Sequence, residues 1–377
     1  MRPPGPTRAA RAARAPSIVA PVFALALVLG MGLAACGSNG SPSTPLTALG
    51  ADHRCIVGGA GSVPQVAWAQ LRNPILAEPD AGVKDQALVW TGGQWHMVFS
   101  YVTNDVTTKG AENWNIASAT SPDLAHWSAP SPWPVQAGVD GVASPDIVRS
   151  PSGTFVATYD SNPDVPTGPQ SKLYYRTSSD LTTWSAPEPL AQSLHPAPGD
   201  RMIDAAVAWT GQGLILGYKY GTATGSTSQH FEIAWSPTGS LRGPWTAVGR
   251  PDIVVDGDTV ENLEFVAAAG RWHLVATSNT FDQPWIFTLS GDPTKPSSWL
   301  HWTGATMLVI PGQSWDSGPG LSSVGFEHAN SVFLCDATGY YYATYSGSSE
   351  LTRFGGWGHA EIGIARSTDL VHWQVPG

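Results

Sequence analysis

The chain of 377 residues has few charged side chains, and basic ones are the scarcer kind. Only 13 % of its residues are charged, with 29 Asp and Glu against 19 Lys and Arg. Four of the basic residues are arginines within the first 14 positions, where no acid occurs. Because phosphate binding needs a basic face, this balance argues against a nucleic-acid partner. The 17 tryptophans argue equally against a disordered chain.

Helical periodicity is also missing from the region after the N-terminus. Apolar residues there either alternate with polar ones or form short continuous runs, which are the patterns of strands. Glycine (41 residues) and proline (32 residues) are abundant, as is typical of short strands joined by tight turns. The composition therefore predicts an all-β fold.

Residues 1–36 are predicted to be an export signal rather than part of that fold. The arginines precede an apolar run, "IVAPVFALALVLGMGLAAC", which ends at Cys36. The final "LAAC" resembles the lipobox of bacterial lipoproteins, in which the cysteine is lipidated and becomes the first residue. An ordinary signal peptide cut near Ala35 is the alternative. Residues 37–50, "GSNGSPSTPLTALG", then form a flexible linker. We expect an exported protein, held at the outer face of the cell membrane by a lipid anchor only, or else released.

Cysteine is rare, with three residues in all. If Cys36 carries lipid, Cys55 and Cys335 remain as a candidate disulfide in an oxidising compartment. One lies at the start of the folded region and the other in its last repeat, so a bridge would join the two ends of the domain. Two buried thiols are the alternative.

A seven-residue string occurs three times in the chain. It reads "SPDLAHW" at 121–127, "SSDLTTW" at 178–184 and "STDLVHW" at 367–373. Each copy follows a Gly-containing turn and an alternating aromatic segment, and looser versions end two further units. We predict that the string is a turn whose Asp and Ser accept backbone N–H groups. Its Trp should pack between neighbouring units, so these aspartates are not counted as catalysts.

The longer units number five, and each is led by an acidic or polar residue. The leading residues are spaced 57 to 67 positions apart, and they are Asp85, Asp146, Asp204, Glu261 and His328. Repeats of this length indicate a supersecondary unit that cannot bury its faces alone. Three strands with room for a fourth make one blade, so residues 51–377 are predicted to form a monomeric five-bladed β-propeller. The last copy ends four residues after its Trp, and we expect the segment "SVPQVAWAQLRNPIL" to supply the missing strand.

The leading residues are also the candidate functional residues. In a propeller the first strand of every blade lines the axis, so carboxylates from blades one, three and four would converge at one mouth. Carboxylates this close to one another shift each other's pKa, and such shifts are typical of catalytic sites. Two carboxyl groups roughly 6.5–9.5 Å apart, one acting as acid and one as base, are what an inverting glycosidase needs.

The segments around these residues resemble the five-bladed glycoside hydrolases of families 43 and 62, which are mostly arabinofuranosidases and xylosidases. The resemblance covers about residues 75–373 and rests on "AGVKDQALVWTGGQWHMVFS", "MIDAAVAWTGQG", "ENLEFVAAAGRWHL" and "EHANSVF". It implies that Asp85 is the general base, that Asp204 orients the acid and tunes its pKa, and that Glu261 is the general acid, with Glu264 as the alternative. "KDQ" and "ENL" depart from the commoner Asp-Pro and Glu-Gly-Pro patterns.

The same resemblance implies an activity and further binding residues. We expect hydrolysis of arabinofuranosyl or xylosyl units from plant-type polysaccharides such as xylan, with an α-L-arabinofuranosidase as the closest activity. Asp146 would line the substrate site, Trp315 would stack on a sugar, and His328 would hold a water molecule or, through water, a structural calcium ion. No cofactor is required. The chain lacks the arginine cluster that a sialidase needs and the motifs of fructan-acting enzymes. A non-catalytic glycan-binding lipoprotein is the alternative function.

Overall fold

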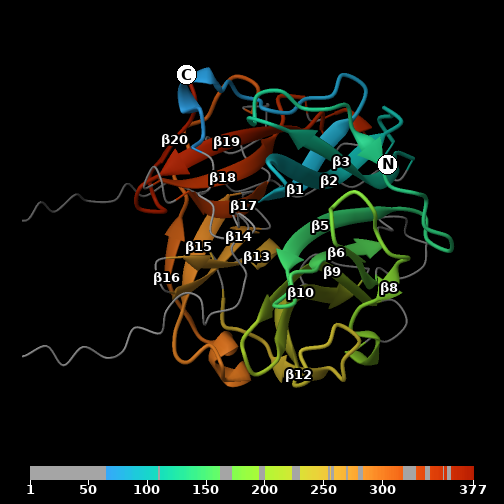
Figure 1. Cartoon of the computed structure of the whole chain (residues 1–377), viewed down its shortest axis with the longest axis vertical. Coiled ribbons are helices and arrows are strands. Elements are labelled where there is room, and N and C mark those ends of the chain that lie inside the picture. Colours follow the sequence, from blue (N-terminus) through green and yellow to red (C-terminus); the bar gives the residue numbers. More distant parts are fainter. Residues whose placement is uncertain are drawn as a thin grey trace, which may run out of the picture. The chain divides into compact units, whose positions relative to one another are not determined.

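Each of the five repeated units forms a four-stranded antiparallel sheet in the computed structural model of the chain (Figure 1). In every sheet the strands pair in sequence order, so each sheet is a simple meander. The structure describes residues 65–377 except 109–110, 162–171, 195–199, 223–229, 254, 256–258, 269–270, 279–282, 317–327, 336–339, 351 and 355–357. The side chains of residues 200, 222, 268 and 328–335 also lie outside the description.

The five sheets are the blades, numbered here in chain order. Blade one contains β1 (Gly82–Thr91), β2 (Gln94–Thr103), β3 (Asn113–Ser121) and β4 (Ser131–Pro132). Blade two contains β5 (Val142–Arg149), β6 (Phe155–Ser161), β7 (Leu173–Ser178) and β8 (Glu188–Pro189). Blade three contains β9 (Asp200–Trp209), β10 (Leu214–Thr222), β11 (His230–Ser236) and β12 (Thr246–Gly249). Blade four contains β13 (Val260–Ala268), β14 (Arg271–Ser278), β15 (Pro284–Leu289) and β16 (Trp302–Met307). Blade five contains β17 (His328–Cys335), β18 (Tyr340–Gly347), β19 (Glu361–Ser367) and β20 (Trp373–Gln374). Short 3-10 helices are η2 (Trp68–Gln70), η3 (Gln192–Leu194) and η5 (Pro296–Leu300).

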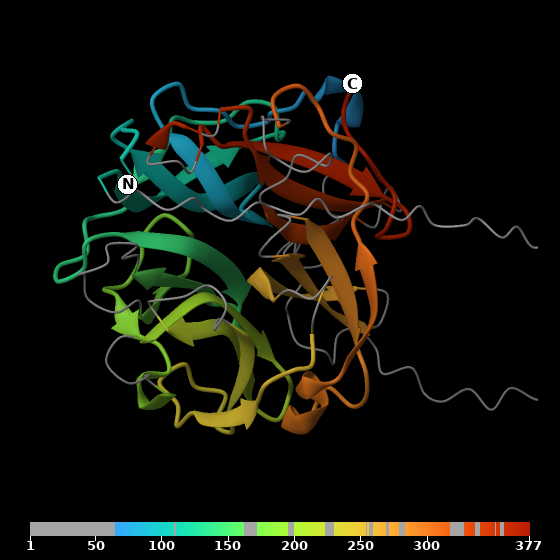
Figure 2. The ribbon, with the colours of Figure 1, turned by 180° about the vertical axis from the view of Figure 1, so that it is seen from behind.

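The first strand of each blade lies at the centre of the ring. β1 contacts β5, β5 contacts β9, β9 contacts β13, and β13 contacts β17, which contacts β1 in turn. The views from the front and from behind show the sheets following one another around this centre (Figures 1 and 2). The prediction of a five-bladed β-propeller is therefore confirmed, and the heads of the five first strands are brought to one place.

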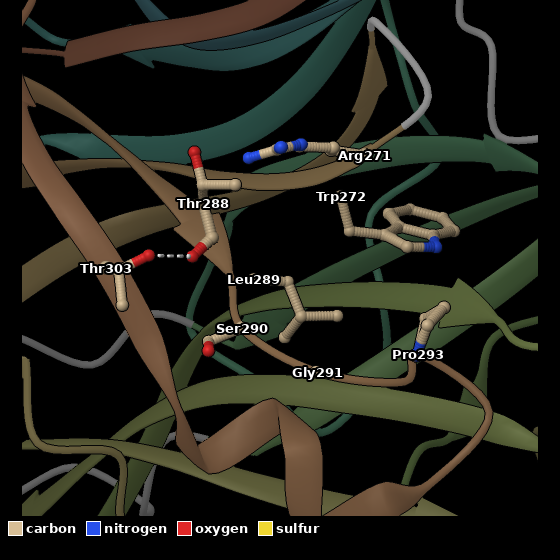
Figure 3. Close-up of a pocket in the computed structure, with 8 residues that line it drawn as sticks. All are labelled: Arg271, Trp272, Thr288, Leu289, Ser290, Gly291, Pro293 and Thr303. Atoms are coloured by element: carbon tan, nitrogen blue, oxygen red, sulfur yellow. Dashed lines mark hydrogen bonds between the residues drawn. The ribbon is translucent and has the colours of Figure 1, made fainter. Parts of the chain in front are cut away.

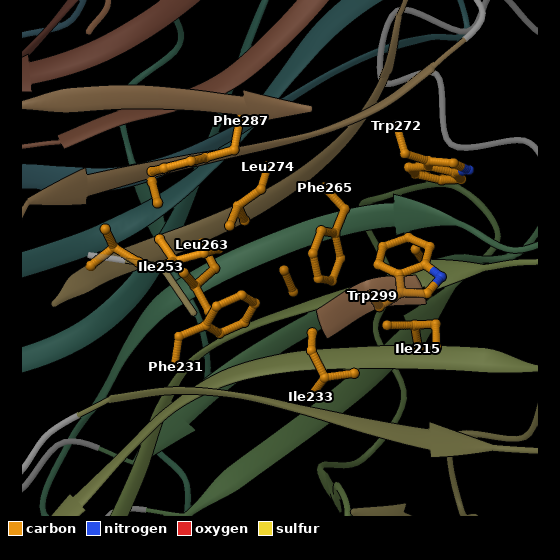
Figure 4. Close-up of a cluster of buried hydrophobic side chains, with 14 of the residues drawn as sticks. Ile215, Phe231, Ile233, Ile253, Leu263, Phe265, Trp272, Leu274, Phe287 and Trp299 are labelled. Atoms are coloured by element: carbon orange, nitrogen blue, oxygen red, sulfur yellow. The ribbon is translucent and has the colours of Figure 1, made fainter. Parts of the chain in front are cut away.

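Apolar side chains fill the wedges between adjacent blades. The cluster between blades three and four, for example, joins Ile215 and Phe231 of blade three to Phe265 and Leu274 of blade four (Figure 4). Similar clusters join the other four pairs of neighbours. Strand side chains alternate between the two faces of a sheet, so each blade contributes one face to each neighbour.

The repeated string forms the predicted turn. In blade one, Ser121 Oγ accepts the N–H of Leu124 at 2.8 Å, and Asp123 Oδ1 accepts the N–H groups of Ala125 and His126 at 2.9 Å. The same bonds recur in blades two and five. Trp127 packs into the cluster between blades five and one. The structural roles predicted for the string are thus confirmed.

The prediction for the fourth strand of blade five is wrong. That strand is β20, which the chain supplies after its own Trp373 and which pairs through two residues with the end of β19. The outer strands β4 and β8 also have two residues each, so a fourth strand of this length is usual in this propeller. The N-terminal segment instead meets β19 at its other end, where Leu76 pairs with Ile362.

The described residues all belong to one compact unit, Ser43–Gly377. The predicted signal peptide, the linker, Cys36 and Cys55 lie outside the described residues. Cys335 ends β17, where its backbone pairs with Tyr340, but its side chain is outside the description, as is the proposed disulfide. Among the described residues, no helix has the length and apolar character needed to cross a membrane.

Candidate functional site

A β-bulge interrupts the first strand near its head in blades one to four. At the bulge two residues of the first strand face one residue of the second, and the pairing skips from Lys84 to Ala87 in blade one and from Glu261 to Glu264 in blade four. One bulge residue in each blade has a left-handed backbone. These residues, with φ between 49° and 56°, are Asp85, Ser144, Asp204 and Asn262. Such bulges bend the strand and re-aim a side chain, so the four blades share one device at the axis.

This register corrects the sequence-based equivalence of the leading residues. Asp85 and Asp204 occupy the same position in their blades. The residue of blade four at that position is Asn262, and Glu261 lies one place earlier, where blade one has Lys84. In blade two the residue equivalent to Asp85 and Asp204 is Ser144, and Asp146 lies two places beyond it. Glu261 thus reaches the axis from a different backbone position than the two aspartates.

Carboxyl groups from neighbouring blades are connected through backbone amides at the axis. The N–H of Asp204 donates to Asp160 Oδ1 of β6 at 3.3 Å, and the N–H of Asn262 donates to Asp204 Oδ2 at 3.2 Å. Lys219 of β10 contacts Glu261 Oε2 through its Nζ. We call Asp85, Asp160, Asp204, Lys219 and Glu261 the axial cluster.

Burial and mutual repulsion shift the proton equilibria of this cluster. Burial raises the pKa of Asp204 to about 6, with Glu261 and Asp85 adding to the rise and Lys219 and the Asn262 N–H opposing it. Burial and the charges of Asp204 and Asp85 raise the pKa of Asp160 well above its usual range. The charge of Asp85 raises the pKa of both Asp160 and Asp204, and that of Glu261 raises the pKa of Asp204, so these carboxyl groups interact electrostatically.

The two side chains of the Lys219–Glu261 ion pair differ in their exposure to solvent. The Lys219 side chain is 3 % exposed, whereas that of Glu261 is 19 % exposed. The ammonium is therefore enclosed between blades three and four, and the carboxylate is the partner that solvent and ligands can reach. A buried ammonium needs a charged partner, which Glu261 supplies.

The other predicted residues lie in different surroundings. Glu264 is 1 % exposed and, by strand alternation, shares a face of β13 with Val266, which packs between blades four and five. Asp146 is buried in β5, opposite Thr158. Trp315 is half-buried, donates its Nε1–H to Gln313 at 3.2 Å, and stacks on Tyr345. One face of its ring is thereby covered.

His328 begins β17 and pairs with Ser346, but its side chain is outside the description. Within the described part of the chain, no three His, Cys, Asp or Glu side chains are placed to hold a metal ion.

Sequence reasoning missed Asp160 and Lys219, which lie on second strands. Both face the residue just before the bulge, as do Ser100 in blade one and Thr277 in blade four. Aligning "VFSY", "ATYD", "LGYKY" and "LVATS" places these four polar residues at one position. That alignment was the available signal, because it compares second strands as well as first strands.

Two surface cavities lie apart from the axial cluster. One, of about 370 Å³, is lined by residues of blade four that include Arg271, Trp272 and Thr288 (Figure 3). Arg271 pairs with Ala268 at the far end of β13 from Glu261, so this cavity is at the opposite end of the blade. The other, of about 570 Å³, lies where the N-terminal segment meets blade five, with Arg366 between Trp68 and Tyr340.

Comparison with known proteins gives structural likeness only. No protein-family model and no curated protein sequence matches the chain. Among solved structures, the catalytic domain of a family GH62 α-L-arabinofuranosidase from Coprinopsis cinerea superposes with a TM-score of 0.56 and 14 % identity, covering 79 % of this chain and 96 % of its own. An α-L-arabinofuranosidase from Lactobacillus brevis gives 0.55 and 14 %, with 81 % and 97 % covered. One from Podospora anserina, in complex with cellotriose, gives 0.51 and 14 %, with 80 % and 94 % covered. At this identity the chain is similar to these enzymes in fold, and the fold is what the likeness shows.

Proposed function

We propose that the chain is a glycoside hydrolase that removes arabinofuranosyl or xylosyl units from plant-type polysaccharides with inversion at the anomeric carbon. The observation that supports this proposal is the electrostatic interaction of Asp204 with Asp85 and Glu261, which belong to first strands of three blades at the centre of the ring. The likeness in fold to α-L-arabinofuranosidases, one of them in complex with an oligosaccharide, supports it.

In the proposed reaction each carboxyl group has its own task. Asp85 takes a proton from the water molecule that attacks the anomeric carbon, and Glu261 gives a proton to the leaving oxygen. Asp204 accepts the Asn262 N–H and thereby holds the backbone next to Glu261. A general acid must carry a proton, whereas Glu261 pairs with the Lys219 ammonium. In the proposed reaction Glu261 therefore takes up a proton from solvent as the leaving oxygen of the substrate replaces Lys219 as its partner.

The Lys219 contact also favours a second candidate function. A carboxylate kept in an ion pair suits the recognition of sugar hydroxyl groups without bond cleavage. On this alternative the protein is a glycan-binding propeller that lacks catalysis. Titration calorimetry with arabinoxylan oligosaccharides, combined with product analysis of the same samples, separates binding with cleavage from binding alone.

Assays of aryl α-L-arabinofuranosides and aryl β-D-xylosides test the proposed activity. In Asp85→Asn or Glu261→Gln we expect kcat to fall by about 10²–10⁴-fold with folding unchanged, since each variant loses a proton-transfer group. Asp292→Asn is the matched control, because this exposed carboxylate follows β15, accepts hydrogen bonds from Thr294 and pairs with Lys295 at 4.0 Å, outside the axial cluster. Full activity in either axial variant would refute the assignment.

We further propose that the protein is an exported lipoprotein anchored through Cys36. The arginine-rich head, the apolar run and "LAAC" support this location. In a bacterial host, Cys36→Ala should move the protein from the detergent phase to the aqueous phase, whereas Cys55→Ala should leave it in the detergent phase. Aqueous partition of the unchanged chain would contradict the lipid anchor.

A further inference from the structure

Side chains of one blade hold the bulge of the next blade. Ser100 Oγ of blade one accepts the N–H of Ser144 in blade two at 2.9 Å. Asp160 Oδ1 of blade two accepts the N–H of Asp204 in blade three at 3.3 Å. Ser100 and Asp160 occupy the same register position, and each supports the left-handed residue of its neighbour.

A serine is therefore enough to satisfy a bulge amide in this fold. Asp160 performs the same task with a carboxyl group that is 3 % exposed, close to the carboxyl groups of Asp204 and Asp85. Enclosing a third carboxyl group there is unfavourable, because buried like charges repel and burial penalises each charge. The need to accept the Asp204 N–H therefore does not explain why position 160 has an aspartate rather than a serine.

A continuous path leads from Asp160 to the proposed acid. Asp160 accepts the Asp204 N–H, and the Asp204 carboxylate accepts the Asn262 N–H, whose residue is the chain neighbour of Glu261. An ionised Asp204 is the stronger acceptor for that second bond. A negative charge on Asp160 would work against that ionised state, whereas a neutral carboxyl group would not.

We propose that Asp160 is a positioning residue that stays protonated at neutral pH and, as a neutral carboxyl group, fixes the backbone of Asp204 while allowing Asp204 to ionise. Among the described residues, the charged groups that act on it are Asp204 and Arg201 of β9 and Asp85 of β1, and burial outweighs the attraction of Arg201. Its effect on catalysis rests on the proposed function, whereas its protonation does not.

Infrared difference spectroscopy tests the protonation without an assay. At pH 7 the unchanged protein should show a carboxylic-acid C=O band that disappears in Asp160→Asn. The band should persist in Asp123→Asn: desolvation is the largest single influence on the Asp123 carboxyl group, but the hydrogen bonds from His126 and the backbone amides together outweigh it and lower the pKa of Asp123. Absence of a band assignable to Asp160 would overturn the proposal even if the protein proves to have no hydrolase activity.

Kinetics test the positioning role if the protein cleaves glycosides. Asp160→Asn keeps a neutral group of equal size and should retain kcat at neutral pH. Asp160→Ser can still accept the Asp204 N–H, as Ser100 accepts that of Ser144, but it removes the buried carboxyl group that fills the space beside Asp204. We expect kcat to fall by about 10- to 100-fold with little change in KM, since an Asp204 that moves into this space misplaces Glu261. A kcat in Asp160→Ser equal to that of the unchanged protein would show that amide acceptance is the whole role of Asp160 and would overturn the proposal.

Discussion

At the scale of single residues, Lys219 determines how the axial cluster is charged. Its cation lowers the pKa of Asp204, whereas burial, Glu261 and Asp85 raise it to about 6. In Lys219→Met we therefore expect the pKa of Asp204 to rise and the acid limb of the profile of kcat/KM against pH to move to higher pH. Lys295→Met, which removes an exposed lysine 4.0 Å from Asp292, should leave the profile unchanged. An acid limb that stays in place in Lys219→Met would contradict this account.

Some residues of the axial cluster could be predicted from the sequence and others could not. Asp85 and Asp204 were identifiable because each stands at the head of a repeated unit. The structure brings Glu261 to them as well, but Asn262 fills the equivalent position. A bulge inserts a residue without any mark in the sequence, so counting along the chain cannot align the heads of the strands. Asp160 enters the cluster through a hydrogen bond to the next blade, between residues 44 positions apart in sequence.

At the scale of elements, the repeated turn makes stability depend on pH. Backbone N–H groups of Thr183 and Thr182 hold the pKa of Asp180 well below its usual range. The carboxylate therefore stabilises the fold above the unfolded-state pKa of about 4, and this contribution is lost as pH falls through the lower folded-state pKa. Asp180→Ala should lower Tm at pH 7, and the difference from the unchanged protein should shrink towards pH 2.

Circular dichroism melts at both pH values measure this effect. Asp180→Asn is the control, because its amide oxygen can still accept the two N–H groups that Asp180 Oδ1 accepts at 2.7 and 2.8 Å. It should lose less Tm at pH 7 than Asp180→Ala. An equal loss of Tm in Asp180→Ala at both pH values would mean that the turn depends on packing rather than on the carboxylate.

Elements were predictable where local residues determine them. The turn string carries its own hydrogen-bond acceptors and its own Trp, so its conformation and position followed from the sequence. The fourth strand of blade five was mispredicted because a two-residue strand leaves almost no pattern. The N-terminal segment shares β19 with β20, an arrangement that depends on how the ring closes rather than on local preference.

At the scale of the whole molecule, the two ends of the described chain meet at blade five. The Asn73 Nδ2, which has two hydrogens to donate, lies 2.9–3.0 Å from three acceptors: Gln313 Oε1, the Tyr345 hydroxyl and the carbonyl oxygen of Ile364. Asn73 Oδ1 accepts the N–H of Ile364 at 2.9 Å. Ile364 lies within β19, so one side chain connects the start of the propeller to its last blade. Since β17 contacts β1, the position of Asp85 depends on this closure.

Removing that connection should destabilise the ring more than removing a comparable amide within one blade. Asn73→Ala breaks bonds to three residues and leaves the N–H and C=O of buried Ile364 without this partner, so we expect a loss of about 2–4 kcal/mol in the free energy of unfolding. Asn115→Ala removes two bonds inside blade one and should lose about 1 kcal/mol. Urea titration of both variants measures the difference. Equal losses would show that the N-terminal segment covers blade five without closing the ring, whereas a larger loss in Asn73→Ala would show that this connection stabilises the closed ring.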